Sequence, residues 1–443
     1  MGSRSSLAVA SRSFHVLVKP AGASCNLQCT YCFYLEKQSL YSGSNLRMSE
    51  ELQEDYIRQL LESHPGPEIP LAWQGGEPTL MGLDFYRRAI ELVRKFQRPG
   101  TRILHTLQTN GVLLDEEWCR FLGEHQFLVG LSLDGPRRMH DAFRVDRGGH
   151  GSFDRVLRAL RLLQQHGVEL NILTSVHDAN VRHPREVYRF LRDEAGARFI
   201  QLIPIVEREG GAVTSRSVRA DSWGRFLIGM LDEWLGRDVG TVFVPIFDAT
   251  LASWVGARPG TCLFEETCGD CLALEHNGDV YACDHFVEPS HRLGNLRETT
   301  LEEILRDPRL ISFGRAKRDT LPSKCQACEF RFACRGECPR RRFLPPDESS
   351  AEAADPLRPR SPGGVNYLCD GYLEFFRHAR RPMGIMAELL RAGRAPSEVM
   401  GVLASERRAL LESAARAGRN SACPCGSGLK VKRCHGDPRF HRT

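Results

Sequence analysis

Three cysteines stand within eight residues near the N-terminus, in the stretch "SCNLQCTYCFY" that begins at Ser24. Cys25, Cys29 and Cys32 offer three thiolate ligands from one short loop. A structural zinc ion takes four protein ligands, whereas a 4Fe–4S cluster held by three cysteines keeps one iron open for a substrate or cofactor. The spacing therefore indicates an iron–sulfur site with an open iron. The alternative is a zinc knuckle whose fourth ligand lies elsewhere.

A second group of nine cysteines lies between Cys262 and Cys369, and four of them are in "CQACEFRFACRGEC". The chain of 443 residues contains 16 cysteines and shows no export signal, so we expect a reducing compartment. There, clustered cysteines are typical of metal ligation rather than disulfides. Two iron–sulfur sites or a pair of zinc ribbons would fit this spacing.

The composition indicates a soluble globular protein of two or three domains. Hydrophobic residues make up 42% of the chain and charged residues 26%, as in ordinary folded proteins. The net charge of +5 is spread along the chain, so we do not expect nucleic-acid binding. No apolar run reaches the roughly 18 residues of a membrane span, and we expect a cytoplasmic location.

Apolar strand-like runs alternate with segments of helical period from about residue 14 to residue 245. This order predicts an α/β fold with a parallel sheet and right-handed crossovers, curled into a partial or complete barrel. The expected strands lie at 14–20, 69–78, 102–111, 127–135, 168–176 and 199–206. The expected helices between them lie at 49–64, 83–96, 115–125, 152–167 and 183–196. Further along, Thr300 and Glu303 form a capping box that begins another helix.

Polar loops follow the first four expected strands. The cysteine loop follows the first, and "QGGEP", "TNG" and "SLDGP" follow the next three. Since the carboxyl ends of parallel strands meet on one face of a barrel, we expect these four loops to converge on one rim. The chemistry should therefore be at this rim.

The cysteine triad, Tyr31 before its last cysteine, and "GGEP" at Gly75–Pro78 resemble the radical S-adenosylmethionine (SAM) enzymes. The resemblance implies that the open iron chelates SAM, and that an electron cleaves it to a 5′-deoxyadenosyl radical. Over residues 14–380 the chain is similar to the anaerobic sulfatase-maturating enzymes, through "KPAGASCNLQCTYCFY", "WQGGEPTL", "FLVGLSLDGP", "HNGDVYACDHFV" and "NYLCDGYLEFF". Those enzymes oxidise a Cys or Ser in a C/S-x-P/A-x-R segment of a sulfatase to Cα-formylglycine.

This similarity implies a partial (β/α)6 radical SAM barrel at residues 14–245 and a SPASM domain at 262–380 with two auxiliary 4Fe–4S clusters. Asp284 is then the base that takes the substrate proton, although by itself it would be an ordinary turn residue. SAM contacts are implied at Tyr31, Gly76, Ser132, Arg144 and Val206, and substrate contacts at Gln74 and Tyr34. The first auxiliary ligand set is Cys262, Cys268, Cys283 and Cys338, and the second is Cys325, Cys328, Cys334 and Cys369. Two cysteines fall outside these sets: Cys119 fits a helix core, and Cys271 could compete with Cys268.

The tail "CPCGSGLKVKRCHG" resembles the SEC-C zinc motif of the bacterial secretion motor ATPase. Cys423, Cys425, Cys434 and His435 give a complete set of ligands for structural zinc. We place a helical linker at 381–419 and the motif at 420–436. The expected partners are a sulfatase polypeptide, a reductant such as flavodoxin or ferredoxin, and the secretion apparatus through the tail.

Two other functions remain open from the sequence. The first is another SPASM peptide-modifying enzyme, which would form thioethers or mature a peptide-derived cofactor. The second is a non-catalytic zinc-ribbon scaffold, which would leave "GGEP" and "SLDGP" without a purpose.

Overall fold

The structure is a computed structural model that describes residues 13–41, 46–209, 212–345 and 363–435. Six parallel strands pair in chain order from β1 to β6, which confirms the predicted α/β class and parallel sheet. The strands are β1 (His15–Lys19), β2 (Glu68–Trp73), β3 (Arg102–Thr109), β4 (Leu128–Ser132), β5 (Glu169–Val176) and β6 (Ile200–Pro204).

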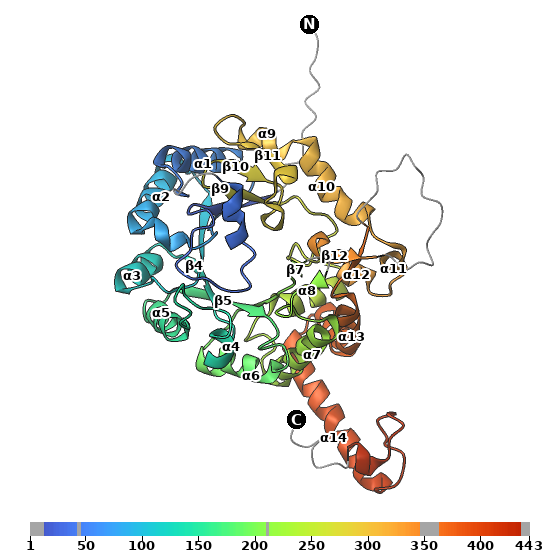
Figure 1. Ribbon diagram of the computed structural model, residues 1–443. Helices are drawn as coiled ribbons and strands as arrows, with labels where there is room; N and C mark the ends of the chain where they lie inside the picture. The colour runs from blue at the N-terminus through green and yellow to red at the C-terminus, as the bar shows by residue number, and fades with distance from the viewer. Residues whose placement is uncertain (1–12, 42–45, 210–211, 346–362, 436–443) are drawn as a thin grey trace.

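Helices α1 to α6 follow the outer side of this curved sheet (Figure 1). Their apolar residues recur at helical spacing; α2, for example, buries Tyr86, Ala89, Ile90 and Val93 on the face toward the core,. The helices are α1 (Glu50–Ser63), α2 (Leu83–Phe96), α3 (Glu116–Glu124), α4 (Arg137–His140), α5 (Phe153–Gln165) and α6 (Pro184–Arg189), and a π-helix (Phe190–Glu194) continues α6.

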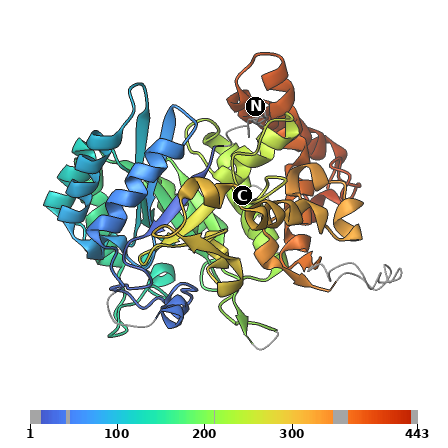
Figure 2. The same cartoon turned by 90° about the horizontal axis from the view of Figure 1, so that it is seen from above.

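The sheet continues beyond β1 into the cysteine-rich part of the chain. Strand β9 (Cys271–Glu275) pairs with β1 in parallel and aligns His15 with Cys271 and Lys19 with Glu275. Strands β10 (Asp279–Tyr281) and β11 (Arg292–Asn295) complete a nine-stranded sheet. Figure 2 shows β9 to β11 between the barrel helices and the C-terminal helices. The barrel and the cysteine-rich region thus share one sheet.

The C-terminal helices pack against the barrel side as well. Helix α7 (Ala220–Arg237) lies along α13 (Cys369–Arg391). Gly224 and Gly371 allow this close approach, because a Cβ on Gly371 would lie 2.0 Å from the Ala220 carbonyl oxygen. One hydrophobic cluster extends from Phe14 to Val399. The barrel expected to end at residue 245 therefore shares one hydrophobic core with the cysteine-rich region that follows it.

Five of the remaining helices in the described ranges have ten or more residues, and the other elements are shorter. The helices are α7 (Ala220–Arg237), α8 (Pro245–Trp254), α9 (Leu301–Leu305), α10 (Pro308–Asp319), α11 (Ser323–Gln326), α12 (Arg331–Cys334), α13 (Cys369–Arg391) and α14 (Val399–Ala417). The strands are β7 (Arg208–Glu209), β8 (Ala212–Val213), β12 (Arg342–Leu344) and β13 (Val365–Asn366). The capping box of Thr300 and Glu303 is present at the start of α9.

Helix α14 extends away from the body of the protein and leads to the C-terminal motif (Figure 1). None of the helices in the described ranges combines the length and the apolar character that crossing a bilayer requires.

Candidate active site

The cysteine loop leaves the end of β1 and lies partly buried at the rim of the barrel. Its three sulfurs are close enough that the thiolates of Cys29 and Cys32 help to raise the pKa of Cys25. Burial is the main cause, and it raises the pKa of Cys25 to about 12 and that of Cys29 to about 11. Such thiols bind a metal with release of their protons. Three free, clustered sulfurs on one loop fit the three-cysteine side of a cubane cluster.

The "GGEP" loop after β2 holds the cysteine loop in place. The Gly76 amide donates to the Gly22 carbonyl at 2.8 Å, and a Cβ on Gly76 would lie 2.0 Å from the Ser24 carbonyl oxygen. The Glu77 amide donates to the same Ser24 oxygen at 2.8 Å. Only glycine permits so close an approach of two loops.

Glu77 links "GGEP" to the next loop of the rim. Its buried carboxylate accepts from the Thr109 hydroxyl at 2.7 Å and the Asn110 amide at 2.8 Å, both beside the end of β3. The Asn110 side chain in turn donates to Asn26 at 2.8 Å and faces the Cys25 sulfur at 3.7 Å. Three of the four expected rim loops are thus joined by hydrogen bonds.

The fourth rim loop, "SLDGP" after β4, supplies a buried carboxylate that the sequence did not single out. Asp134 accepts from the Tyr31 hydroxyl at 2.6 Å and from Arg144 Nε at 2.8 Å and Nη2 at 3.1 Å. It also accepts from the Ser175 amide at 2.9 Å. Burial is the largest single effect and opposes its ionisation, but the interactions with Arg144 and His177 together outweigh it and hold the pKa of Asp134 well below its usual range. Asp134 therefore orients two of the residues expected to contact SAM.

Arg144 and Tyr31 also contact each other within this network. The guanidinium lies over the Tyr31 ring, 5.5 Å from its centroid, and His177 stacks on Tyr31 with the ring centroids 5.6 Å apart. Arg144 Nη2 also donates to the Ser175 hydroxyl at 3.3 Å. The sequence did contain a signal for Asp134: it is the one charged residue of the rim loop "SLDGP".

Replacing Asp134 by asparagine is expected to weaken SAM binding at least about tenfold. The change removes the charge that holds Arg144 and leaves a buried guanidinium without its counter-ion. The measurement is the SAM concentration dependence of the spectral change of the reduced, reconstituted protein. Asp154→Asn is the matched control, because Asp154 pairs with Arg137 at the exposed surface. Equal SAM affinity in Asp134→Asn and the wild type would contradict this role.

Asp284, the expected base, lies buried after β10 and forms an ion pair with Lys19 at the end of β1. Lys19 is itself buried, and its ammonium lies 4.8 Å from the centroid of the Tyr34 ring. Burial is the largest single effect and opposes ionisation of Asp284, but the interactions with Lys19, His285 and Lys37 together outweigh it and lower the pKa of the carboxyl. The structure therefore holds Asp284 as a carboxylate beside the cysteine loop, as a base requires.

The other expected contact residues lie around the same rim. Ser132 ends β4 and is buried, and Val206 follows β6 and packs against the core. The backbone amide of Gln74 donates to the Val18 carbonyl at 2.8 Å, just after β2. The buried Tyr34 hydroxyl donates to Glu275, so it faces β9 rather than an open space.

Electrostatic interactions link auxiliary cysteines within each of the two sets named from the sequence. In the first group, Cys262 interacts electrostatically with Cys268 and Cys338, and Cys283 with Cys338. In the second, Cys325 interacts with Cys328 and Cys369, and Cys334 with Cys369. Each group therefore has at least the four thiols that a cluster with four cysteine ligands requires.

Cys271 lies with the first group, where it interacts with Cys262 and Cys283. Burial is the largest cause that raises its pKa to about 12. Cys271 is thus a fifth thiol at this site, and its competition with Cys268 stays a prediction. Cys119 is fully buried in α3, away from these groups.

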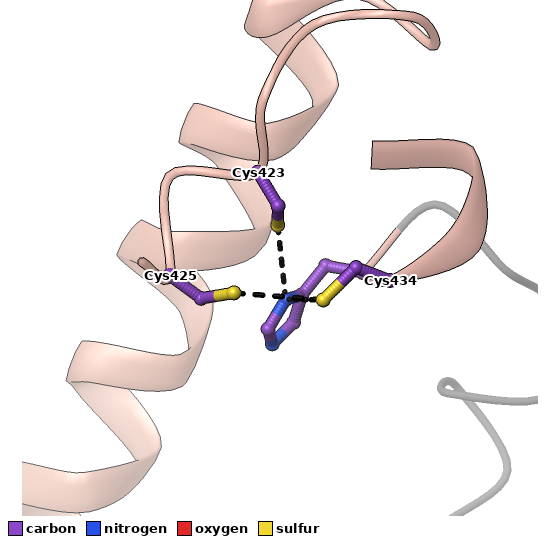
Figure 3. A group of neighbouring side chains, drawn as sticks. Cys423, Cys425 and Cys434 are labelled. Carbon is purple, nitrogen blue, oxygen red and sulfur yellow. Dashed lines mark hydrogen bonds between the residues drawn. The ribbon is translucent and has the colours of Figure 1, made fainter. Parts of the chain in front are cut away.

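The C-terminal motif brings three thiols and one imidazole together (Figure 3). The ligand atoms of Cys423, Cys425, Cys434 and His435 all lie within 4.8 Å of one another. The Cys423 sulfur is 3.3 Å from His435 Nδ1, and the Cys425 and Cys434 sulfurs are 3.5 Å apart. Tetrahedral zinc with Zn–S bonds of about 2.3 Å spaces its ligands by roughly 3.7 Å. The four groups therefore fit a tetrahedral metal ion.

Three family models match the chain. The Radical SAM superfamily model matches residues 20–191, the SPASM iron–sulfur cluster-binding domain matches 262–329, and the SEC-C motif matches 419–437.

Curated relatives match nearly their whole length. The serine-type anaerobic sulfatase-maturating enzyme of Bacteroides thetaiotaomicron is 42% identical over 409 residues, which cover 88% of this chain and 95% of that protein. The cysteine-type enzyme of Clostridium perfringens is 34% identical over 374 residues, which cover 82% of this chain and 95% of that protein.

A solved structure is similar over the same region. The structure of native anSMEcpe with bound AdoMet and Kp18Cys peptide matches with a TM-score of 0.75 at 32% identity. The match covers 85% of this chain and 99% of that chain. The resemblance drawn from the sequence motifs is confirmed, and this chain belongs to the family of anaerobic sulfatase-maturating enzymes.

Proposed function

We propose that this protein oxidises a Ser or Cys side chain in a sulfatase polypeptide to Cα-formylglycine. The observation that carries the proposal is the 42% identity to the Bacteroides enzyme over 95% of its length. The buried rim of "GGEP", Asp134 and Arg144 supports it, because a zinc-ribbon scaffold would have no need for this network. Serine-type and cysteine-type enzymes both match this chain, so we include Ser and Cys as possible targets.

Mass spectrometry of model peptides tests this function. The reconstituted, reduced protein is incubated with SAM and three peptides that differ only in carrying Ser, Cys or Ala at the target position of an x-P-x-R segment. We expect the Ser or the Cys peptide to gain an aldehyde and the Ala peptide to stay unchanged. A thioether in the Cys peptide, with no aldehyde in either, would instead identify another SPASM peptide-modifying enzyme.

The cofactors of this reaction are SAM and iron–sulfur clusters. Cys25, Cys29 and Cys32 would hold the SAM-binding 4Fe–4S cluster, and the two groups of four cysteines would hold the auxiliary ones. With these groups bound and reduced, the site would supply a 5′-deoxyadenosyl radical able to remove a hydrogen atom from the target Cβ. An electron donor such as flavodoxin or ferredoxin is required for the reduction.

The chain's own residues would position SAM. Arg144 offers a guanidinium that is suited to the methionyl carboxylate, and Asp134 keeps its orientation. Gly76, which leaves no room for a side chain, presents backbone polar groups where the SAM amino group would bind. Tyr31, Ser132 and Val206 complete the proposed set of contacts around the rim.

Asp284 would accept the proton that the substrate loses. Its carboxylate is held ionised by Lys19, so it can take the hydroxyl or thiol proton as the carbon–heteroatom double bond forms. Asp284 and Lys19 are both buried, which keeps bulk water away from the carboxylate. Asp284 is therefore assigned the role of general base.

The C-terminal motif is proposed to hold structural zinc. Hydrogen bonds from Ser427 lower the pKa of Cys425 to about 6, which favours the thiolate that zinc requires. We expect Cys425→Ser to lose the zinc that the wild-type protein carries, as measured by elemental analysis. Cys119→Ala is the matched control and should keep it. Retention of a full zinc complement by Cys425→Ser would contradict the assignment.

Contact with the secretion apparatus through this motif stays a prediction. Deleting residues 420–443 is expected to lower the maturation of an exported sulfatase in cells. Peptide turnover by the purified variant should be unchanged, because the motif lies beyond α14, away from the barrel (Figure 1). Normal maturation in cells would rule the contact out.

A further inference from the structure

Five lysine and arginine side chains are buried in the part of the chain that the structure describes: Lys19, Arg144, Lys317, Arg341 and Arg342. Three of them have a carboxylate partner. Lys19 pairs with Asp284, Arg144 with Asp134, and Arg341 with Glu337. Within the described ranges, Lys317 and Arg342 form no ion pair with a carboxylate, although they are only 1% and 5% exposed. A buried charge without a counter-ion is costly, so these two cations require another anion nearby.

Lys317 lies in the last turn of α10 and points at the first auxiliary group. Its ammonium donates to the carbonyl oxygens of Cys262 at 2.6 Å and Leu263 at 2.9 Å. Burial raises the pKa of Cys262 and Cys268, and the Lys317 charge is the leading effect that opposes it at both thiols. The ammonium therefore favours negative charge on these sulfurs.

Arg342, at the start of β12, interacts electrostatically with cysteines of both auxiliary groups. Among the residues that the structure describes, its guanidinium donates only to carbonyl oxygens: Lys317 at 2.6 Å, Gly336 at 2.8 Å, Arg335 at 2.9 Å and Glu337 at 3.1 Å. These carbonyls satisfy its hydrogen bonds but carry no full charge, and the nearest carboxylate, Glu337, already forms an ion pair with Arg341. Arg342 opposes the burial effect at Cys268 of the first group and at Cys325 of the second.

We propose that Lys317 and Arg342 are the counter-charges of the anionic iron–sulfur clusters held by the two auxiliary cysteine groups, Lys317 for the first and Arg342 for both. Adding one electron makes a cluster more negative by one charge, and a fixed cation nearby favours that form. The two side chains therefore raise the reduction potentials of the auxiliary clusters and make them better electron acceptors. The inference rests on the proposed function only in taking both groups to bind clusters.

The test measures auxiliary cluster potentials in the full-length chain with Cys25, Cys29 and Cys32 replaced by alanine, so that only the auxiliary signals remain. Potentials come from redox titration followed by electron paramagnetic resonance, with iron and sulfide assays. Lys317→Met should shift one reduction equilibrium at least tenfold toward the oxidised form, which is about 59 mV for a one-electron couple. Arg342→Gln should shift both in the same direction.

Charge-keeping variants separate charge from shape. Lys317→Arg and Arg342→Lys should keep potentials close to those of the parent protein, as should Lys95→Met on the surface. If Lys317→Met and Arg342→Gln lose iron while the charge-keeping variants retain it, the proposal is also supported, because the cation is then needed to hold an anionic group. Unchanged potentials in iron-replete neutral variants would overturn it, and so would equal iron loss from neutral and charge-keeping variants. None of these readouts uses a peptide, so they stay separate from a failure to form formylglycine.

Discussion

Replacing Cys25, Cys29 and Cys32 by alanine is expected to abolish both 5′-deoxyadenosine formation and peptide oxidation. These thiols lie on one loop at the rim, where Arg144 and Gly76 would hold SAM. Without them no iron is left open for SAM, and no other described group can replace it. Bound iron should fall by about a third, since two of the three clusters have their own cysteines. Chromatography of the nucleoside products and an iron assay measure both effects.

Cys119→Ala is the matched control for this triple variant. Its thiol is fully buried in α3 and belongs to none of the cysteine groups, so activity and iron content should be those of the wild type. Deoxyadenosine production by the triple variant, or the loss of all its iron, would contradict the assignment of an independent SAM-binding site.

Replacing Asp284 by asparagine should lower peptide oxidation by about 10²–10⁴-fold. The variant lacks the carboxylate that takes the substrate proton, whereas the triad and the Arg144 network are untouched. SAM cleavage should therefore continue, with deoxyadenosine formed in excess over formylglycine. The ratio of the two products, measured in one reaction, separates this effect from a general loss of activity.

Stability needs its own control, because Asp284→Asn leaves the buried Lys19 unpaired. Breaking a buried pair in this way costs about 3–5 kcal/mol of folding free energy. The double variant Lys19→Met/Asp284→Asn removes both charges and should regain stability without regaining activity. Lys19→Met alone removes the main charge that opposes the effect of burial, so it raises the pKa of Asp284. As the pH is lowered, this variant should therefore lose activity at a higher pH than the wild type does. Full peptide oxidation by Asp284→Asn would exclude it as the base.

The sheet and its helices were predictable because their signals are local. Six strands and five helices were expected, and each is present within a few residues of its expected position. Amphipathic spacing, as on α2, and the capping box at Thr300 depend on residues only a few positions apart. The metal motifs were visible for the same reason, since their cysteines are close in sequence.

The contacts that hold the site together could not be read in this way. Asp134 reaches Tyr31 across 103 residues, and Lys19 reaches Asp284 only because β9 pairs with β1. The pairing of β9 with β1 joins two regions that the sequence presented as separate domains. Lys317 and Arg342 resemble ordinary surface cations in the sequence, and only their burial reveals that an anion is required.

A radical generated at the rim is expected to take a hydrogen atom from the target side chain. The most direct measurement uses a sulfatase peptide with deuterium at the Cβ of its target serine, incubated with the reduced protein and SAM. We predict deuterium in the 5′-deoxyadenosine and one formylglycine for each labelled nucleoside. Formylglycine accompanied only by unlabelled 5′-deoxyadenosine, or no 5′-deoxyadenosine at all, would contradict the account.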